Sequence, residues 1–218
     1  MSFGFPFSPL RRLLHVAGLA MLMAGGVNTS ASAQSQAPSA AKQDATTVVD
    51  IVGRTVHIPA RVDHILLGEG RFLYALALME GPEPLTRIVG WQGELAFADP
   101  NGWAAYKQRF PQIASIPLIG RTSEDSVSFE KSVSTKPDIA IFGLGGHGPG
   151  RQSGLVKELE KSGVPVVFID FRAQPVRNTA NSIRILGKAV HREAAANAYA
   201  DFYEARLQRV QSLSLIHI

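Results

Sequence analysis

Short apolar segments alternate with helical patterns over most of this sequence, and this alternation most constrains the fold. The apolar segments lie at residues 64–67, 87–90, 117–119, 138–142 and 164–169. Apolar residues at helical spacing occupy residues 71–79, 100–110, 128–134 and 151–162. Strands that are apolar throughout are typical of a sheet buried on both faces. The pattern therefore predicts an α/β fold, a Rossmann-like lobe with a parallel sheet covered by helices.

Two further elements flank this alternation. Residues 47–58 contain two β-branched runs around Gly53 and predict a β-hairpin. Residues 176–212 contain no proline and predict one long helix, which can divide at Gly187. An undivided helix would be about three times the average length. We therefore expect it to leave a lobe at residues 47–175 and to lead to a second lobe, which this chain lacks.

The first 33 residues have the layout of a secretory signal peptide. Arg11 and Arg12 precede an apolar run, and the small residues Ala31-Ser32-Ala33 follow it. The run is shorter than the roughly 20 residues of a membrane span. We expect cleavage near Ala33 and a disordered tether at residues 34–46, because that segment has little to bury. The arginine pair leaves both the general and the twin-arginine export route open.

Composition excludes several kinds of site. The chain has no cysteine, which excludes a lipid-anchored cysteine, disulfides and thiolate metal sites. Without Arg11 and Arg12, 20 of the 22 basic residues remain against 18 acidic ones, a net charge of +2. This balance does not fit a nucleic-acid binder. The histidines show no paired-ligand spacing, so no metal site is expected.

Five segments, in the right order, resemble periplasmic substrate-binding proteins of the ferric-siderophore and cobalamin importer class. They are residues 50–66, 128–131, 136–141, 163–170 and 182–194. The resemblance implies two α/β lobes joined by a rigid helix, with the ligand in the cleft between them. This chain would supply the N-terminal lobe and the linking helix.

The resemblance also implies a function. The exported protein would be a periplasmic carrier that captures an iron chelate, namely a ferric siderophore or ferric citrate, with haem and cobalamin left open. It would deliver that ligand to the permease of an ABC importer. Such a protein is expected to act as a monomer, without catalysis and without a resident cofactor.

Candidate ligand contacts lie in the loops that leave the strands, because parallel α/β sheets bind ligands beyond the carboxyl ends of their strands. These candidates are Glu69, Arg71, Trp91, Arg121, Thr122, His147 and Arg172. Arginine suits an anionic chelate because its planar fork can donate two hydrogen bonds to one carboxylate. The alternative for each arginine is a solvated surface position, and for Trp91 it is packing inside the lobe.

Glu130 is a candidate of another kind. In the family that the sequence resembles, an acidic residue at the start of this helix pairs with an arginine of the importer. An exposed charge of this kind mainly sets registration and association rate. From the residue alone, Glu130 is equally a favourable partner for the helix dipole.

A second function stays open as the alternative. Gly143, Gly145 and Gly148 have the G-x-G-x-x-G spacing after an apolar strand, and Asp170 closes the next strand. This is the dinucleotide-binding fingerprint and would indicate an exported oxidoreductase. However, Pro149 delays the following helix, strand–helix units precede the motif, and nicotinamide cofactors are scarce outside the cytoplasm. We therefore favour a flexible glycine-rich loop at the mouth of the cleft.

Overall fold

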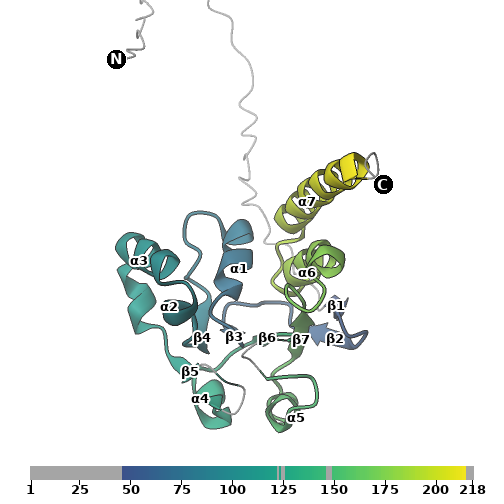
Figure 1. The fold of residues 1–218 in the computed structure, drawn as a ribbon. Coiled ribbons are helices and arrows are strands. Elements are labelled where there is room, and N and C mark those ends of the chain that lie inside the picture. The colour runs from purple at the N-terminus through teal and green to yellow at the C-terminus, as the bar shows by residue number, and fades with distance from the viewer. Residues whose placement is uncertain (1–45, 122, 124–125, 146–148, 215–218) are drawn as a thin grey trace, which may run out of the picture. The chain divides into compact units, whose positions relative to one another are not determined.

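The computed structural model describes residues 46–121, 123, 126–145 and 149–214 of the chain (Figure 1). The predicted signal peptide and nearly all of the predicted tether lie outside the described residues. The candidate contacts Thr122 and His147 also lie outside them.

The centre of the fold is a five-stranded sheet whose neighbouring strands are all parallel. The strands are β3 (Ile65–Leu67), β4 (Ile88–Gln92), β5 (Leu118–Gly120), β6 (Ile139–Gly143) and β7 (Val166–Ile169). Their order is β5-β4-β3-β6-β7. The chain builds outward from β3 in one direction and then from β6 in the other, so the strand order switches between β3 and β6. The predicted Rossmann-like parallel sheet is confirmed.

Both faces of the sheet are buried. Ile65 and Leu67 of β3 lie in one hydrophobic cluster, while Leu66 between them lies in the other. The strands β6 and β7 divide in the same way, as the two-residue period of a strand requires. Figure 1 shows α1 (Phe72–Glu80) on one face and α4 (Phe129–Ser134) and α5 (Gly154–Lys161) on the other. This two-sided burial explains why the strands have no polar alternation.

Two short helical elements lie outside the sequence-based predictions. They are α2 (Leu95–Ala98), which precedes the predicted helix α3 (Pro100–Arg109), and the 3₁₀ turn η1 (Pro111–Ser115). An element of four or five residues is barely longer than one helical turn, so its apolar residues cannot show a repeat.

The predicted hairpin consists of β1 (Thr46–Val49) and β2 (Thr55–Ile58), and it covers the free edge of β7. The backbone amide of Ile51 donates to the carbonyl of Phe168 (3.1 Å). The guanidinium of Arg54 donates to the carbonyl of Val166 (2.6 Å). An unpaired edge strand invites aggregation, and the hairpin blocks that edge.

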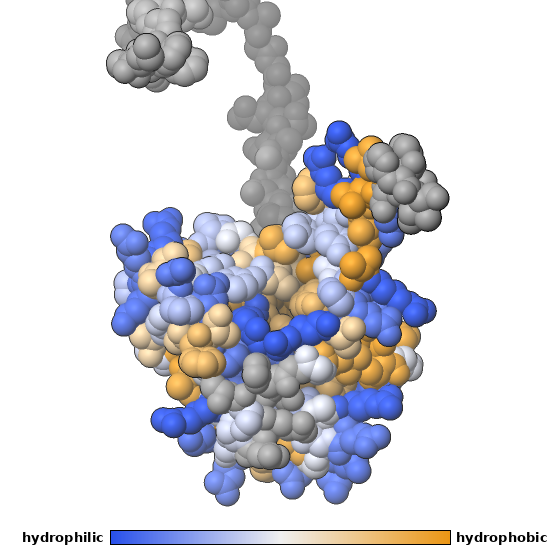
Figure 2. Space-filling view, viewed as in Figure 1, coloured by the Kyte–Doolittle hydropathy of each residue, from blue (hydrophilic) through white to orange (hydrophobic). Residues whose placement is uncertain are grey.

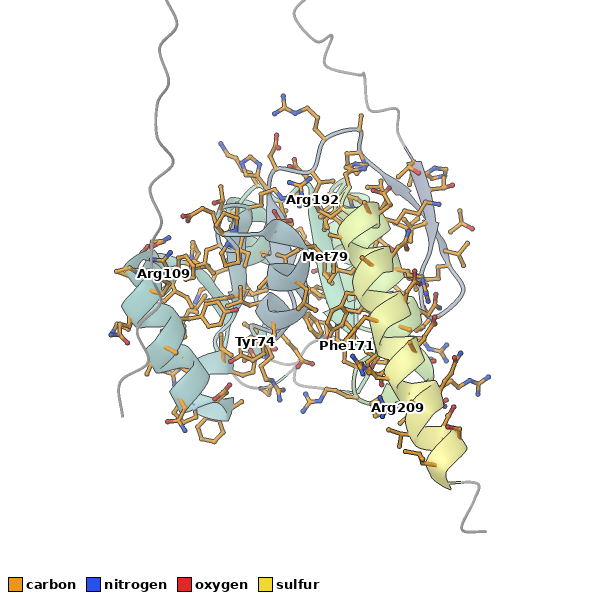
Figure 3. All side chains as sticks on the ribbon, turned by 90° about the horizontal axis from the view of Figure 1, so that it is seen from above. Tyr74, Met79, Arg109, Phe171, Arg192 and Arg209 are labelled. Atoms are coloured by element: carbon orange, nitrogen blue, oxygen red, sulfur yellow. The ribbon has the colours of Figure 1, made fainter. Side chains whose placement is uncertain are left out.

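The C-terminal region forms two helices, α6 (Pro175–Ala189) and α7 (Glu193–Ser214). The chain divides at residues 190–192, just beyond Gly187, and His191 has a positive φ of 56°. The imidazole Nε2 of His191 lies 2.8 Å from the carbonyl oxygen of Pro59. Figure 3 shows α7 running from the end of the lobe near Arg192 past Phe171 to Arg209.

The two helices are held together by a close approach and by ion pairs. A Cβ atom added to Gly187 would lie 2.1 Å from the Cβ of Ala196, so only glycine fits there. The guanidinium of Arg184 pairs with Glu204 (2.7 Å) and Asp201 (2.6 Å). Hydrogen bonds from Arg184 lower the pKa of the Glu204 carboxyl. Gly187 therefore sets the contact between α6 and α7 rather than the break between them.

Replacing Gly187 with alanine should separate α6 from α7. We expect Gly187→Ala to lower the free energy of unfolding by about 1–2 kcal/mol, because overpacking outweighs the gain in helix propensity. Urea denaturation measures this change. Gly154→Ala is the matched control, because no atom lies within 4 Å of an added Cβ at the start of α5. Equal stability of the two variants would contradict the close approach.

Candidate functional site

The candidate site lies at the carboxyl edge of the sheet, beside the switch in strand order between β3 and β6. Figure 3 shows Tyr74 and Phe171 at this end of the lobe, with Met79 and Arg192 toward the other end. Figure 2 looks onto the edge and shows hydrophilic side chains across its middle. Hydrophobic side chains lie to the left, near α2 and β5, and gather more strongly to the right, near β1 and β2.

Two of the candidate arginines, Arg71 and Arg172, form ion pairs with the candidate Glu69. The Oε2 atom of Glu69, in the loop after β3, accepts hydrogen bonds from Arg71 (3.0 Å) and from Arg172 in the loop after β7 (3.1 Å). The side chain of Glu69 is only 2% exposed, whereas those of Arg71 and Arg172 are 27% and 35% exposed. The carboxylate is therefore buried beneath two guanidinium groups that reach solvent.

A second buried carboxylate holds the backbone of the same loop. Glu94, which follows β4, accepts the backbone amides of Gly70 (2.9 Å) and Arg71 (3.0 Å). Its Oε1 also lies 3.6 Å from the Nε of Arg71. A Cβ at Gly70 would lie 3.0 Å from the carbonyl oxygen of Gln92, so the two loops touch closely. Nothing in the sequence pattern marked Glu94 as a site residue.

A groove of about 400 Å³ runs from Arg71 between α1, α6 and α7. Its lining is mostly apolar and includes Tyr74, Leu78, Phe171, Ile183 and Tyr199. The Tyr74 hydroxyl donates to Asp99 (2.6 Å). Burial and this hydrogen bond raise the pKa of Tyr74, and the same hydrogen bond lowers the pKa of Asp99. Tyr74 thus lines the groove as a neutral phenol.

Of the remaining candidate contacts, the structure describes Trp91 and Arg121, which lie along the same edge. Trp91 is 1% exposed and packs against Trp103, with ring centroids 6.3 Å apart, which fits the packing interpretation. Arg121 is exposed in the loop after β5, and its backbone amide donates to Ser126 (2.9 Å). Phe97 on α2 is 81% exposed and was missed, because α2 was not predicted.

Glu130 lies on a different part of the lobe, in the first turn of α4. Its side chain is exposed. The helix is capped independently by Ser128, whose hydroxyl accepts the backbone amide of Lys131 (3.3 Å). Glu130 is therefore free of a role in the cap, and a partner can reach its carboxylate.

Asp170, the acid of the alternative dinucleotide fingerprint, holds the loop that leads into α6. Its carboxylate accepts the backbone amides of Arg172 (2.8 Å), Ala173 (2.7 Å) and Gln174 (3.0 Å), and the side-chain amide of Asn178 (2.7 Å). The residue is fully buried, so this carboxylate does not face a ligand.

Gly143 of the same fingerprint also has a packing role. An added Cβ would lie 2.6 Å from the ring of Phe72 in α1, so glycine is needed for that contact. Two residues of the fingerprint, Gly143 and Asp170, are therefore explained by helix packing and by hydrogen bonds to the loop before α6.

The hydrogen bonds of the Asp170 carboxylate predict a pH-dependent contribution to stability. Burial alone would raise its pKa, but the hydrogen bonds from Asn178 and the three amides hold that pKa below its usual value. A carboxyl with a lowered pKa stabilises the fold above its unfolded pKa of about 4, and loses this effect as pH falls through the folded value.

Asp170→Asn should therefore cost about 1–2 kcal/mol of unfolding free energy at pH 7, and the difference should shrink below about pH 4. Urea denaturation from pH 3 to pH 7 measures it. Asp63→Asn, in an exposed pair with Arg61, is the control and should change stability by less than about 0.5 kcal/mol. A difference that stays constant down to pH 3 would contradict the role of the charge.

Among the described residues, no three histidine, aspartate or glutamate side chains come together in a way that could hold a metal ion. No helix in the same part of the chain is both long and apolar enough to span a membrane.

Comparisons with known proteins agree with this architecture. TroA-like FepB from Veillonella parvula superposes with a TM-score of 0.65 at 22% identity, over 75% of this chain and 48% of its own. MolA from Haemophilus influenzae, bound to molybdate, gives 0.56 at 15% identity, over 71% and 49%. Holo-ViuP gives 0.54 at 16% identity, over 77% and 51%. The chain thus spans about half the length of these structures, with which it shares a fold.

No curated protein matches the sequence. A model of one family, described as periplasmic binding protein, matches residues 99–213, which is just over half of the chain. The matched range includes the carboxyl-edge loops after β5, β6 and β7 together with α6 and nearly all of α7. This chain therefore belongs to the periplasmic binding protein family.

Proposed function

We propose that this chain is the first lobe of a two-lobed periplasmic carrier that captures an anionic iron chelate and delivers it to an ABC importer. The observation that carries the proposal is the pair of arginines at the carboxyl edge, Arg71 and Arg172, which buried Glu69 holds side by side. Guanidinium groups in this arrangement offer several N–H donors to carboxylate or similar oxygens.

The rest of the edge supports the same function. The groove beside Arg71 is lined by aromatic and aliphatic side chains, which suits the organic part of a chelate. Exposed Phe97 adds another aromatic ring at this edge. Arg121, exposed in the loop after β5, adds a third guanidinium group to the edge. Ferric citrate and carboxylate siderophores combine anionic oxygens with carbon skeletons and fit these features.

The proposed second lobe explains why α7 continues beyond the site. From Phe202 onward it carries exposed apolar side chains, namely Phe202, Val210 and Leu213. In the two-lobed protein this helix would link the lobes, and the cleft would close over the carboxyl edge. The signal peptide at residues 1–33, cleaved near Ala33, would bring the protein to the periplasm.

Titration of the two-lobed protein tests the ligand class. Ferric citrate, a carboxylate siderophore, haem, cobalamin and molybdate are added in turn, and quenching of Trp91 and Trp103 fluorescence reports binding. Tight binding of the ferric chelates is the expected result. Tight binding of only haem, cobalamin or molybdate would overturn the chelate assignment. Binding of NAD with none of the others would restore the oxidoreductase alternative.

Single arginine substitutions test the site itself. Arg71→Ala and Arg172→Ala should each weaken ferric citrate binding by about tenfold or more, because each removes charge-assisted hydrogen bonds. Arg121→Ala should cost less, because its side chain lies in water. Arg109→Ala is the control, since Figure 3 shows Arg109 away from Tyr74 and Phe171. Unchanged affinity in the first two variants would remove them from the site.

Glu130 is proposed to dock the carrier on the importer. Glu130→Lys should leave the dissociation constant for ferric citrate unchanged and should slow uptake of iron-labelled chelate by about tenfold or more, because the charge is reversed at the contact. Glu83→Lys, at another exposed position after α1, is the matched control. Normal uptake by the Glu130→Lys protein would contradict the docking role.

A further inference from the structure

We propose that Glu69 is a positioning residue that holds Arg71 and Arg172 in their ligand-binding geometry and does not contact the ligand itself. This inference rests on the proposed function of the carboxyl edge. Glu69 is 2% exposed, so a ligand in the cleft cannot reach its carboxylate without displacing the arginines. Its Oε2 atom accepts from both guanidinium groups, at 3.0 and 3.1 Å.

The two arginines need such a partner because they come from separate loops. Arg71 stands before α1, whereas Arg172 follows β7, 103 positions beyond Glu69. Each long side chain would otherwise sample many rotamers and would lose that freedom only when ligand binds. Two like charges this close would also repel each other without the carboxylate between them. By pairing with both arginines in the free protein, Glu69 restricts their rotamers and offsets their repulsion before the ligand binds.

The position of Glu69 is fixed by its surroundings. On one side, a Cβ at Gly143 would lie 3.6 Å from the Oε1 of Glu69, so the strand β6 passes close by. The preceding residue, Gly68, donates its backbone amide to Ile141 (2.8 Å). On the other side, Glu94 holds the amides of Gly70 and Arg71. The backbone is thus anchored on both sides of Glu69, and its carboxylate is held by the two guanidinium groups.

The charges of these four side chains cancel. Arg71 and Arg172 contribute two positive charges, and Glu69 and Glu94 contribute two negative ones. These four side chains therefore offer a ligand oriented N–H donors without a net positive charge. The affinity that comes from these hydrogen bonds should fall little at high salt, because salt screens short hydrogen bonds much less than long-range attraction.

The test is a double-mutant cycle in the two-lobed protein, with ferric citrate as the probe in about 0.5 M salt, where long-range attraction is largely screened. Glu69→Gln should weaken binding by about tenfold when both arginines are present, a coupling typical of contacting residues. In the Arg71→Ala/Arg172→Ala background, Glu69→Gln should change affinity by less than about twofold. Glu160→Gln, in the ion pair with Arg54 away from the site, is the control and should bind normally.

Three results would overturn the proposal. Tighter binding by Glu69→Gln would mean that Glu69 acts only as a repelling charge. Equal losses in the two backgrounds would mean a general role in folding, and unchanged affinity would mean no role. If Glu69→Gln fails to fold, Glu69→Asp takes its place; it keeps the charge but is shorter, and a loss of affinity that depends on the arginines is again expected. Failure of the proposed function is separate, since the arginine variants would then bind as well as wild type.

Discussion

Burial of both faces of the parallel sheet is the constraint on which the rest of the molecule depends. Because the strands bury both faces, their side chains are committed to packing, and only the strand ends are left for binding. Parallel strands bring all their carboxyl ends to one edge. Loops far apart in the sequence therefore meet there, and the loops after β3, β4 and β7 share one network of ion pairs and hydrogen bonds.

In that network the acidic and the basic side chains differ in their burial. The carboxylates Glu69, Glu94 and Asp170 are buried, and each is satisfied by backbone amides, guanidinium groups or both. Buried carboxylates need such partners, because an uncompensated buried charge is very costly. The arginines carry the complementary charge outward. At this edge the acids are thus buried, and Arg71 and Arg172 reach solvent.

Much of the fold could be predicted from the sequence. The strands and longer helices lie within a few residues of their predicted positions, since apolar runs and helical spacing are strong local signals. By contrast, α2 and η1 are too short to show a period. Gly187 was ambiguous, because a glycine within a helical pattern can mark either a break or a close contact. Only the position of Ala196 in the folded chain decides for contact.

The site was less predictable, for a physical reason. Strand ends identify loops, so Arg71 and Arg172 could be selected, but their joint pairing with Glu69 depends on loops 103 positions apart. Exposure is also a tertiary property. Trp91 and Phe97 are aromatic residues six positions apart after the same strand signal, yet one is inside the lobe and the other faces water. The strand signal made Trp91 a candidate and passed over Phe97, because it carries no information on which ring the folded chain buries.

Gly187 and Ala196 are in contact near the start of the long helix α7. From Ala196 to the end of α7 the helix extends for about 27 Å at 1.5 Å per residue. Tilting it by about 5° at this contact would move its far end by about 2 Å, more than the slack in a hydrogen bond. The ion pairs of Arg184 reach only as far as Glu204, so the outer turns follow whatever direction the inner ones set. The direction of the outer turns of α7 therefore depends on how closely a glycine and an alanine pack near its start.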